Sequence, residues 1–364
     1  MLTIMISTKN RSDFLIRLLN YYAEVDYKHL IVIGDSSDSY HFAKTERVVK
    51  NLEGRLKIRH YKHLGLNLPT SIRELIRVVS TPYAGFIADD DFLIPSRFEE
   101  AIKFLENNPG YSAVQGVGIL FSLKSSGPYG EFSSISPYVL RSIESDTASK
   151  RFIDHLNSYS VTLFSIYKTQ TWKKMYKNIT KIEDRAFADE LLPCFLSVIY
   201  GKVKKLPGLY LVRQVHDRRY HLPDIYDWFT KLDWFPSYRV FHDSLIEGLL
   251  QQENIPQEKA QAIFKKAFWG YLNDRLSDKF KQRYGILSPK DRAKKISKCI
   301  PGAYKIVKRI KQLFSSKELT LNSLLNKKST YYTDFLPVYN AVINIPKDYQ
   351  EEGHGGADTS GIIV

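Results

Sequence analysis

Short apolar runs that alternate with helical spacing constrain the fold of this chain more than any other feature. We predict β-strands at residues 3–7, 30–33, 56–61 and 83–88, where the apolar runs have strand length. We predict helices between them at residues 12–22, 41–53 and 69–79. Strands that alternate with helices in this way indicate βαβ units. The sequence therefore predicts an α/β fold, a Rossmann-like and mostly parallel sheet flanked by helices.

Further along the chain the pattern is less regular. We predict a helix at residues 95–108, strands at 113–121, 160–168 and 203–213, and a further helix that begins near Ala188. Residues 122–145 are rich in serine, glycine and proline, which predicts a long loop over the ligand site. From residue 225 to about residue 314 the pattern is mostly helical.

Polar side chains follow three of the first four predicted strands. They are Ser7, Thr8, Lys9, Asn10 and Arg11 after the first strand, Asp35 after the second, and Asp89, Asp90 and Asp91 after the fourth. In a parallel α/β sheet, ligands bind outside the carboxyl ends of the strands. We therefore expect these side chains to gather at one edge of the sheet and the aspartates to face a cleft.

Three adjacent aspartates repel one another, so something must offset their charge. Mg²⁺ or Mn²⁺ prefers carboxylate and phosphate oxygens, and such a cation would also neutralise a diphosphate. The alternative is a solvated turn whose carboxylates only cap the helix that begins near Pro95. The position of the aspartates directly after the apolar run "FIA" favours the metal.

Three segments in order, "TIMISTKNRSDFLIRLLNYY", "LIVIGDSSDS" and "STPYAGFIADDDFLIPSRF", resemble the nucleotide-binding half of a GT-A, family-2-like bacterial glycosyltransferase. The resemblance covers about residues 2–220. It implies a nucleotide-diphosphate sugar donor, a divalent metal, and inversion or retention at a sugar carbon. It also implies that Ser7 to Arg11 and Asp35 surround the base and ribose. Arg73 falls where such enzymes often place an arginine near the nucleotide, the alternative being a solvated helix residue.

Two alignments of the motif select different metal ligands, because many relatives read Asp-x-Asp-Asp where this chain reads Ala88 and three aspartates. Counting back from Pro95 places Ala88 at the first aspartate of that pattern, whereas the Asp-x-Asp spacing selects Asp89 and Asp91. Asp91 is our first choice of metal ligand, and Asp89 or Asp90 shares the donor contact.

The resemblance also implies an acidic general base on a helix after the acceptor-side strand. Asp189 fits this position, with Glu190 as the second candidate. The alternative is that both are ordinary helix-start acids favoured by the helix dipole. We expect the nearby Glu183 and Asp184 to be solvated. Relatives often place a histidine after the next strand, so His216 is a candidate ligand of the metal or the diphosphate.

The net charge of +14 is concentrated in the C-terminal part of the chain. Residues 265–330 contain 18 Lys and Arg against 4 Asp and Glu, which accounts for the whole excess. Residues 291–314 have the spacing of a basic amphipathic helix, suited either to an anionic membrane surface or to packing on the catalytic domain. We predict a catalytic domain at residues 1–224, a helical basic C-terminal extension at 225–350 and a disordered tail at 351–364. No nucleic-acid module is recognised.

These observations predict a metal-dependent glycosyltransferase that moves a sugar from a nucleotide-diphosphate donor to a surface glycan or a lipid-linked glycan, such as a lipopolysaccharide or capsule. Inversion follows from the resemblance. Two alternatives remain: a nucleotidyltransferase that uses the aspartates with Mg²⁺, and a non-catalytic GT-A-like binding protein. Two distant cysteines and the lack of an apolar run of membrane-spanning length predict a cytoplasmic protein, peripheral on the inner face of the membrane.

Overall fold

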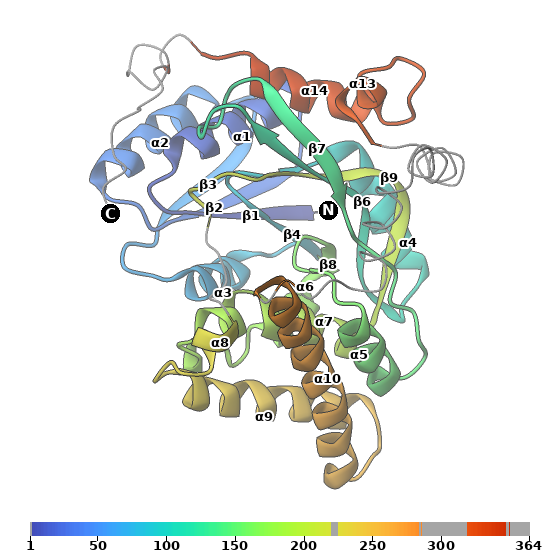
Figure 1. Ribbon diagram of the computed structural model, residues 1–364. Coiled ribbons are helices and arrows are strands. Elements are labelled where there is room, and N and C mark those ends of the chain that lie inside the picture. Colours follow the sequence, from blue (N-terminus) through green and yellow to red (C-terminus); the bar gives the residue numbers. More distant parts are fainter. Residues whose placement is uncertain (1, 220–224, 284, 286–318, 347–348, 350–364) are drawn as a thin grey trace, which may run out of the picture.

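The computed structural model describes residues 2–219, 225–283, 285, 319–346 and 349. In these residues a nine-stranded sheet has the order β3-β2-β1-β4-β8-β6-β9-β5, and β7 pairs with β6 (Figure 1). The prediction of an α/β fold with a sheet flanked by helices is confirmed.

The N-terminal half of the sheet is parallel. It consists of β1 (Leu2–Thr8), β2 (Leu30–Asp35), β3 (Lys57–Lys62) and β4 (Tyr83–Ala88). The register pairs Thr8 with Asp35 and Ser7 with Ala88. The carboxyl ends of these strands therefore lie side by side, as the sequence predicts, and the aspartates follow directly after β4.

The second half of the sheet is mixed. It consists of β5 (Phe92–Leu93), β6 (Tyr111–Leu123), β7 (Phe132–Tyr138), β8 (Ile166–Lys168) and β9 (Lys202–Gln214). The short strand β5 pairs antiparallel with the end of β9, matching Phe92 to Val212. This pairing brings the last residues of β9 against the three aspartates, which lie between β4 and β5.

Helices cover both faces of the sheet (Figure 1). On one side lie α1 (Ser12–Glu24), α2 (Ser39–Asn51) and α14 (Tyr332–Ile343). On the other lie α3 (Leu68–Val78), α6 (Thr169–Met175), α7 (Leu192–Tyr200), α9 (Trp234–Gln252) and α10 (Gln257–Arg283). The remaining helices are α4 (Phe98–Asn107), α5 (Ala148–Asn157), α8 (Ile225–Trp228) and α13 (Leu321–Leu324).

Three sequence expectations need correction. Residues 122–145 are not one loop, because β7 occupies part of them and pairs with β6. The strand expected at 160–168 is shorter and is limited to β8. The helix expected near Ala188 is preceded by a π-helical turn, Phe187–Leu191. In the first case the serines of β7 lie on a partly exposed strand, so it lacks the apolar run that marks a buried one.

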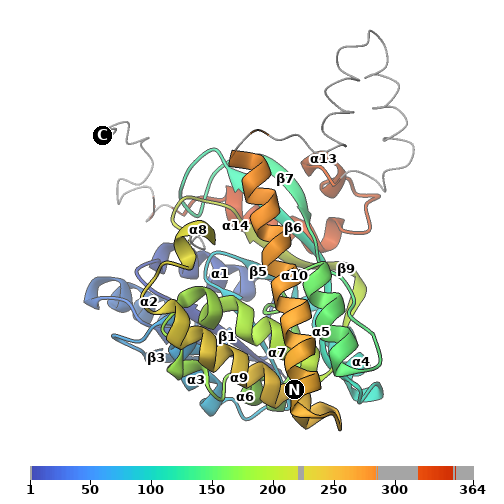
Figure 2. The ribbon, with the colours of Figure 1, turned by 60° about the horizontal axis from the view of Figure 1, so that its bottom comes forward.

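The C-terminal extension is helical where the structure describes it, and it divides between the two faces of the sheet. Helices α9 and α10 lie on the side of α7, whereas α13 and α14 lie on the side of α1 (Figures 1 and 2). The predicted basic amphipathic helix at 291–314 and the tail at 351–364 both lie outside the described residues. Among the described helices, none has both the length and the apolar character needed to cross a bilayer.

Strand β3 forms one edge of the sheet. Its sequence is KIRHYK, in which every second or third residue is basic and most side chains are partly or fully exposed.

Candidate functional site

The three aspartates at the end of β4 are all buried, yet each contacts a different part of the fold. Asp89, Asp90 and Asp91 have relative exposures of 0%, 4% and 1%. They form a turn in which the Asp91 amide donates to the Ala88 carbonyl at 3.2 Å. A solvated turn, the alternative considered from the sequence, is therefore ruled out in this structure.

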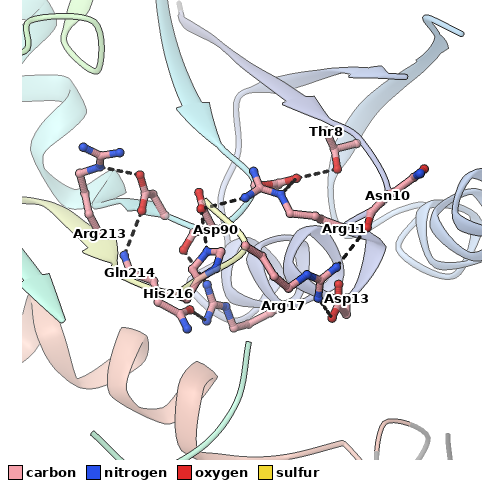
Figure 3. Close-up of polar contacts among 12 residues, drawn as sticks. Thr8, Asn10, Arg11, Asp13, Arg17, Asp90, Arg213, Gln214 and His216 are labelled. Atoms are coloured by element: carbon pink, nitrogen blue, oxygen red, sulfur yellow. Dashed lines mark hydrogen bonds and ion pairs between the residues drawn. The ribbon is translucent and has the colours of Figure 1, made fainter. Parts of the chain in front are cut away.

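The three carboxylates have different sets of partners, although Arg11 contacts two of them (Figure 3). Asp89 accepts a hydrogen bond from Thr8 Oγ1 at 2.7 Å and pairs with Arg11. Asp90 lies 3.1 Å from Arg11 Nη1 and 2.9 Å from His216 Nε2.

The third carboxylate, Asp91, faces β9. It accepts from Arg213 Nε at 2.7 Å and from the Gln214 backbone amide at 3.0 Å, so both of its oxygens are occupied. Arg213 in turn lies over the ring of Phe164, with its guanidinium carbon 4.3 Å from the ring centroid. Asp91, our first choice of metal ligand, thus links the acidic turn to β9, and its role as a metal ligand stays a prediction.

In this structure arginines offset the charge of the three carboxylates, and the expected cation stays a prediction. Arg11 pairs with two of the aspartates and Arg213 with the third. Burial raises the pKa of Asp89 and that of Asp91, since desolvation outweighs the nearby arginines there. The pKa of Asp90 is lowered despite its burial, because His216 and Arg11 stabilise its ionised form. Asp90 is therefore the carboxylate of this cluster that stays charged most readily.

Arg17 of α1 is a buried residue of the site that the sequence analysis missed. Its guanidinium donates to the Asp90 carbonyl at 2.7 Å, and to Gln214 Oε1 and the Pro128 carbonyl at 2.5 Å each. Complete burial lowers its pKa to about 10. One signal was available: Arg17 lies three residues after Phe14, within the apolar face of the helix.

The loop after β1 is held in place by Asn10. This residue has a φ of 53°, a left-handed conformation that asparagine tolerates better than most residues. Its amide donates to Ser37 Oγ at 2.8 Å, and its side-chain oxygen accepts from the Asp38 amide at 2.9 Å. Asn10 therefore ties the end of β1 to the end of β2, while the neighbouring Lys9 remains exposed.

Two other candidates for donor binding, Ser7 and Asp35, lie at strand ends but form hydrogen bonds within the protein. Ser7 Oγ donates to Ser71 Oγ at 3.2 Å and lies at the strand end as expected. Asp35 is also at its strand end, but it is fully buried and accepts from the Ser37 amide at 2.9 Å and from His60 Nε2 at 3.0 Å. Those hydrogen bonds lower its pKa despite the burial. In this conformation Asp35 is buried beneath the strand ends and is not accessible to a ligand.

Arg73 lies on α3 and donates to Thr180 Oγ1 at 2.7 Å. It has no hydrogen bond or ion pair with the acidic turn among the described residues. The structure therefore does not bring it together with the three aspartates.

The residues around Asp90 fit a divalent cation. Asp90 Oδ2 and His216 Nε2 lie 2.9 Å apart as a hydrogen-bonded pair, and a carboxylate oxygen and an imidazole nitrogen are both ligand types for divalent cations. The other oxygen of Asp90 has no partner among the described residues. The His216 ring stacks on Phe14, with centroids 4.6 Å apart, which fixes its orientation. The described residues contain no group of three or more acidic, histidine or cysteine ligands, so two protein ligands are the most this site offers.

The proposed base lies on an unusual turn. Residues Phe187–Leu191 form a π-helical turn that continues directly into α7. Pro193 in the first turn of α7 has no backbone N–H, and in a regular α-helix its ring would clash with the carbonyl four residues earlier, that of Asp189. A π-turn widens the helix at this point and relieves the clash. The position of Asp189 thus follows from the proline.

Asp189 combines burial with an unsatisfied oxygen. Its Oδ2 accepts from Arg185 Nε at 2.9 Å, and its Oδ1 is buried with no hydrogen-bond partner among the described residues. Burial raises the pKa of Asp189 to about 6, although the charge of Arg185 opposes this. A carboxylate with a pKa close to neutral and a free oxygen can accept a proton from a ligand.

The two other acids of this segment have structural contacts. Asp184 is completely buried, which corrects the expectation that it is solvated, and it accepts from the Phe187 amide at 3.0 Å and from Trp228 Nε1 at 2.9 Å. Glu190 accepts from Tyr159 Oη at 2.9 Å.

Glu190 also lies near the acidic turn. Burial raises the pKa of Tyr138 to about 12, and the charge of Glu190 acts in the same direction. The Tyr138 hydroxyl accepts from Arg213 at 3.1 Å, and Arg213 pairs with Asp91. The helical turn that carries Asp189 and Glu190 and the strand ends that carry the aspartates therefore border the same region.

The order of the strands defines an α/β domain. In such domains ligands bind at the carboxyl ends of the strands, which here carry polar side chains. The sequence model described as "Glycosyl transferase family 2" matches residues 3–168. This match covers less than half of the chain, and it confirms that residues 3–168 resemble glycosyl transferase family 2, as the sequence motifs indicate. No match was found among curated proteins.

Several solved structures are similar in outline. S. aureus TarS 1–349 in complex with UDP-GlcNAc is 13% identical, with a TM-score of 0.47, over 97% of this chain and 92% of that one. Mannosyltransferase PcManGT from Pyrobaculum calidifontis, in complex with GDP-Man and Mn²⁺, is 12% identical, with a TM-score of 0.43, over 86% of this chain and 87% of that one. The match to a longer S. aureus TarS structure covers 42% of that chain.

Proposed function

We propose that this protein transfers a sugar from a nucleotide-diphosphate donor to a hydroxyl group of a glycan acceptor, with inversion at the sugar carbon. The match of residues 3–168 to the model of glycosyl transferase family 2 supports the class of reaction. The assignment of the general base rests on one observation. Asp189 is a buried carboxylate with a raised pKa and an oxygen that no described residue satisfies, and it borders the region of the acidic turn.

The donor would bind along the ends of β1, β2 and β4. Thr8, Asn10 and Arg11 shape this edge, and Lys9 is exposed beside them. Arg11 stays protonated here, because the paired aspartates raise its pKa despite its burial. It therefore remains charged in the presence of a diphosphate, whose oxygens it can bind.

Asp90 and His216 would hold a divalent cation, Mn²⁺ or Mg²⁺, and the donor phosphates and water would complete its coordination. Such a cation supplies positive charge that stabilises the departing diphosphate. Support for this role comes from the contact between the two side chains and from the low pKa of Asp90, which keeps its carboxylate charged.

Asp189 would accept the proton of the acceptor hydroxyl as the new bond forms. Glu190 is held by Tyr159 and fits a positioning role better than that of the base. We include in the proposal a surface-glycan or lipid-linked acceptor and a cytoplasmic location. The described cysteine, Cys194, is buried and not in a disulfide, which suits a reducing compartment.

A thermal-shift screen of UDP-, GDP- and dTDP-sugars, each with and without Mn²⁺, tests the proposal. A ligand that binds only the native state raises the melting temperature as its concentration rises above its Kd. We expect at least one nucleotide sugar to stabilise the protein, more so with Mn²⁺. Asp90→Asn and His216→Gln should each remove the Mn²⁺-dependent part of the shift. Asp243→Asn, on an exposed surface of α9, is the matched control.

The products then separate the alternatives. Release of a nucleoside diphosphate from the sugar donor supports a glycosyltransferase. Production of pyrophosphate from a nucleoside triphosphate would indicate a nucleotidyltransferase instead. If no nucleotide sugar either shifts the melting temperature or is hydrolysed, the protein is a binding protein that has kept the fold, and the proposal is wrong.

A further inference from the structure

A cavity of ≈ 440 Å³ adjoins the turn that carries Asp189, and this volume lies within the range of small-molecule sites. Its walls come from three parts of the chain that are distant in sequence: the end of α5 with Tyr159, the π-helical turn through Glu190, and the second half of α10. Figure 2 shows α10 lying along α5 and across α7.

The lining combines aromatic and polar groups. Tyr159 and Tyr271 stand edge to face, with ring centroids 5.4 Å apart, and form the apolar part of the wall. Asn157 and Asp274 are exposed and have no hydrogen-bond or ion-pair partner among the described residues. Arg275 adds a guanidinium next to them, with its own hydrogen bond to the Tyr271 hydroxyl.

These groups match the chemistry of a sugar ring. A sugar presents C–H faces that pack on aromatic rings, and hydroxyl groups that both donate and accept hydrogen bonds. The cavity offers a carboxylate and an amide oxygen as acceptors, and an amide and a guanidinium as donors. A purely apolar ligand would leave these groups unpaired, at a cost in free energy.

The position of the cavity indicates which sugar it would hold. Glu190 lines the cavity and is the chain neighbour of Asp189. The charge of Glu190 also acts on Tyr138, whose hydroxyl accepts a hydrogen bond from Arg213 of the site at the strand ends. A ligand in the cavity would therefore contact the turn that carries the base.

We infer that this cavity is the acceptor subsite and that it binds a sugar or polyol unit of the glycan, with α10 supplying its specificity through Tyr271, Asp274 and Arg275. The inference rests on the proposed function and assigns a role to the C-terminal extension, which is outside the residues matched by the family. The helix α10 thus completes the active site.

Two variants and a matched control test the assignment. Asn157→Trp fills the cavity from an exposed position, so folding is not at risk, and Arg275→Gln removes its guanidinium. Lys266→Gln makes the same charge change at an exposed position of α10 that does not line the cavity. The probes are the p-nitrophenyl glycosides of glucose, galactose, mannose and N-acetylglucosamine, first by saturation-transfer NMR and then as acceptors with the nucleotide sugar selected in the donor screen.

We expect at least one glycoside to bind the wild-type protein and the Lys266→Gln variant equally. Its NMR signal should be lost in Asn157→Trp, and the ratio of sugar transfer to donor hydrolysis should fall at least tenfold in both cavity variants. If none of the glycosides binds, or if the variants transfer sugar as the control does, the cavity is not the acceptor subsite. In that case a wild-type protein that still hydrolyses the donor keeps the proposed function, whereas absent donor hydrolysis rejects the proposed function itself.

Discussion

At the scale of single residues, the site depends on buried carboxylates that are paired with arginine and histidine side chains. The three aspartates after β4 are held by Arg11, Arg213 and His216, and Arg17 binds the backbone of the same turn. Removing one partner of such a pair leaves the other buried and uncompensated, which costs more than the pair itself contributes. Asp189 is also paired, with Arg185, but its second oxygen is buried and has no described partner.

This second oxygen leads to a prediction for Asp189→Asn. Without the base we expect the rate of transfer to fall by about 10²–10⁴-fold. The fold should become more stable at high pH. The pKa of Asp189 is about 6 in the folded state and about 3.9 in an unfolded chain, so the folded state holds the proton more tightly. The wild-type protein therefore loses stability as the pH rises from about 4 to above 6, by up to about 3 kcal/mol in total.

Urea unfolding of both proteins at pH 4 and at pH 8 measures this effect. The free energy of unfolding of Asp189→Asn, relative to the wild type, should be greater at pH 8 than at pH 4. An equal difference at the two pH values would mean that Asp189 is not a strained buried carboxylate. In the wild type, kcat/KM should rise with pH and level off above about pH 6, as the base loses its proton.

At the scale of elements, the active-site geometry is set by where helices and strands begin and end. The π-helical turn at Phe187–Leu191 is the clearest case, because Pro193 prevents a regular α-helix from passing through Asp189. Asp184 supports the start of this turn by accepting from the Phe187 amide. The backbone conformation therefore fixes the position of Asp189 before any ligand binds.

Replacing the proline tests this explanation. Pro193→Ala restores the N–H and removes the ring, so the turn can relax to α-helical geometry and move the Asp189 side chain. We expect the melting temperature to stay within a few degrees of the wild type, since alanine favours helices, and the rate of transfer to fall at least tenfold. Pro69→Ala, in the first turn of α3, serves as the control. Unchanged kinetics in Pro193→Ala would show that the proline does not position the base.

The sequence predicted the carboxyl ends of the strands well, but it did not predict which side chains contact the acids at those ends. An apolar run that stops at Asp35 or Asp89 marks the carboxyl end of a buried strand, because burial and polarity change at the same residue. The partners of those acids come from far along the chain, as with Asp91 and Arg213, so local patterns carry no information about them. The cavity beside Glu190 was missed for the same reason.

At the scale of the whole molecule, the C-terminal helix α14 returns to the N-terminal half of the sheet. Asp334 of α14 accepts a hydrogen bond from Ser96 at 2.7 Å and pairs with Arg97. Near the end of α14, the Val342 carbonyl accepts from the Gly130 amide at 3.1 Å. Gly130 belongs to the same loop as Pro128, which contacts Arg17. The end of the chain thus supports the loop that closes around the acidic turn.

We predict that Asp334→Ala weakens this docking. The change leaves Arg97 without its carboxylate partner and should lower the free energy of unfolding by about 1–3 kcal/mol. Hydrogen exchange should become faster in α14 and also in residues 127–131. Asp243→Ala, whose carboxylate contacts only the neighbouring His242 among the described residues, is the control. Faster exchange in α14 alone would mean that the loop is held independently.

The basic residues of β3 have a consequence for how the molecule behaves at high concentration. An edge strand with free backbone groups can pair with the same strand of another copy and so start aggregation. In β3 two copies would bring Lys57, Arg59 and Lys62 of each strand together, and like charges at that spacing oppose pairing. The parallel half of the sheet is thereby protected from uncontrolled growth by its own side chains.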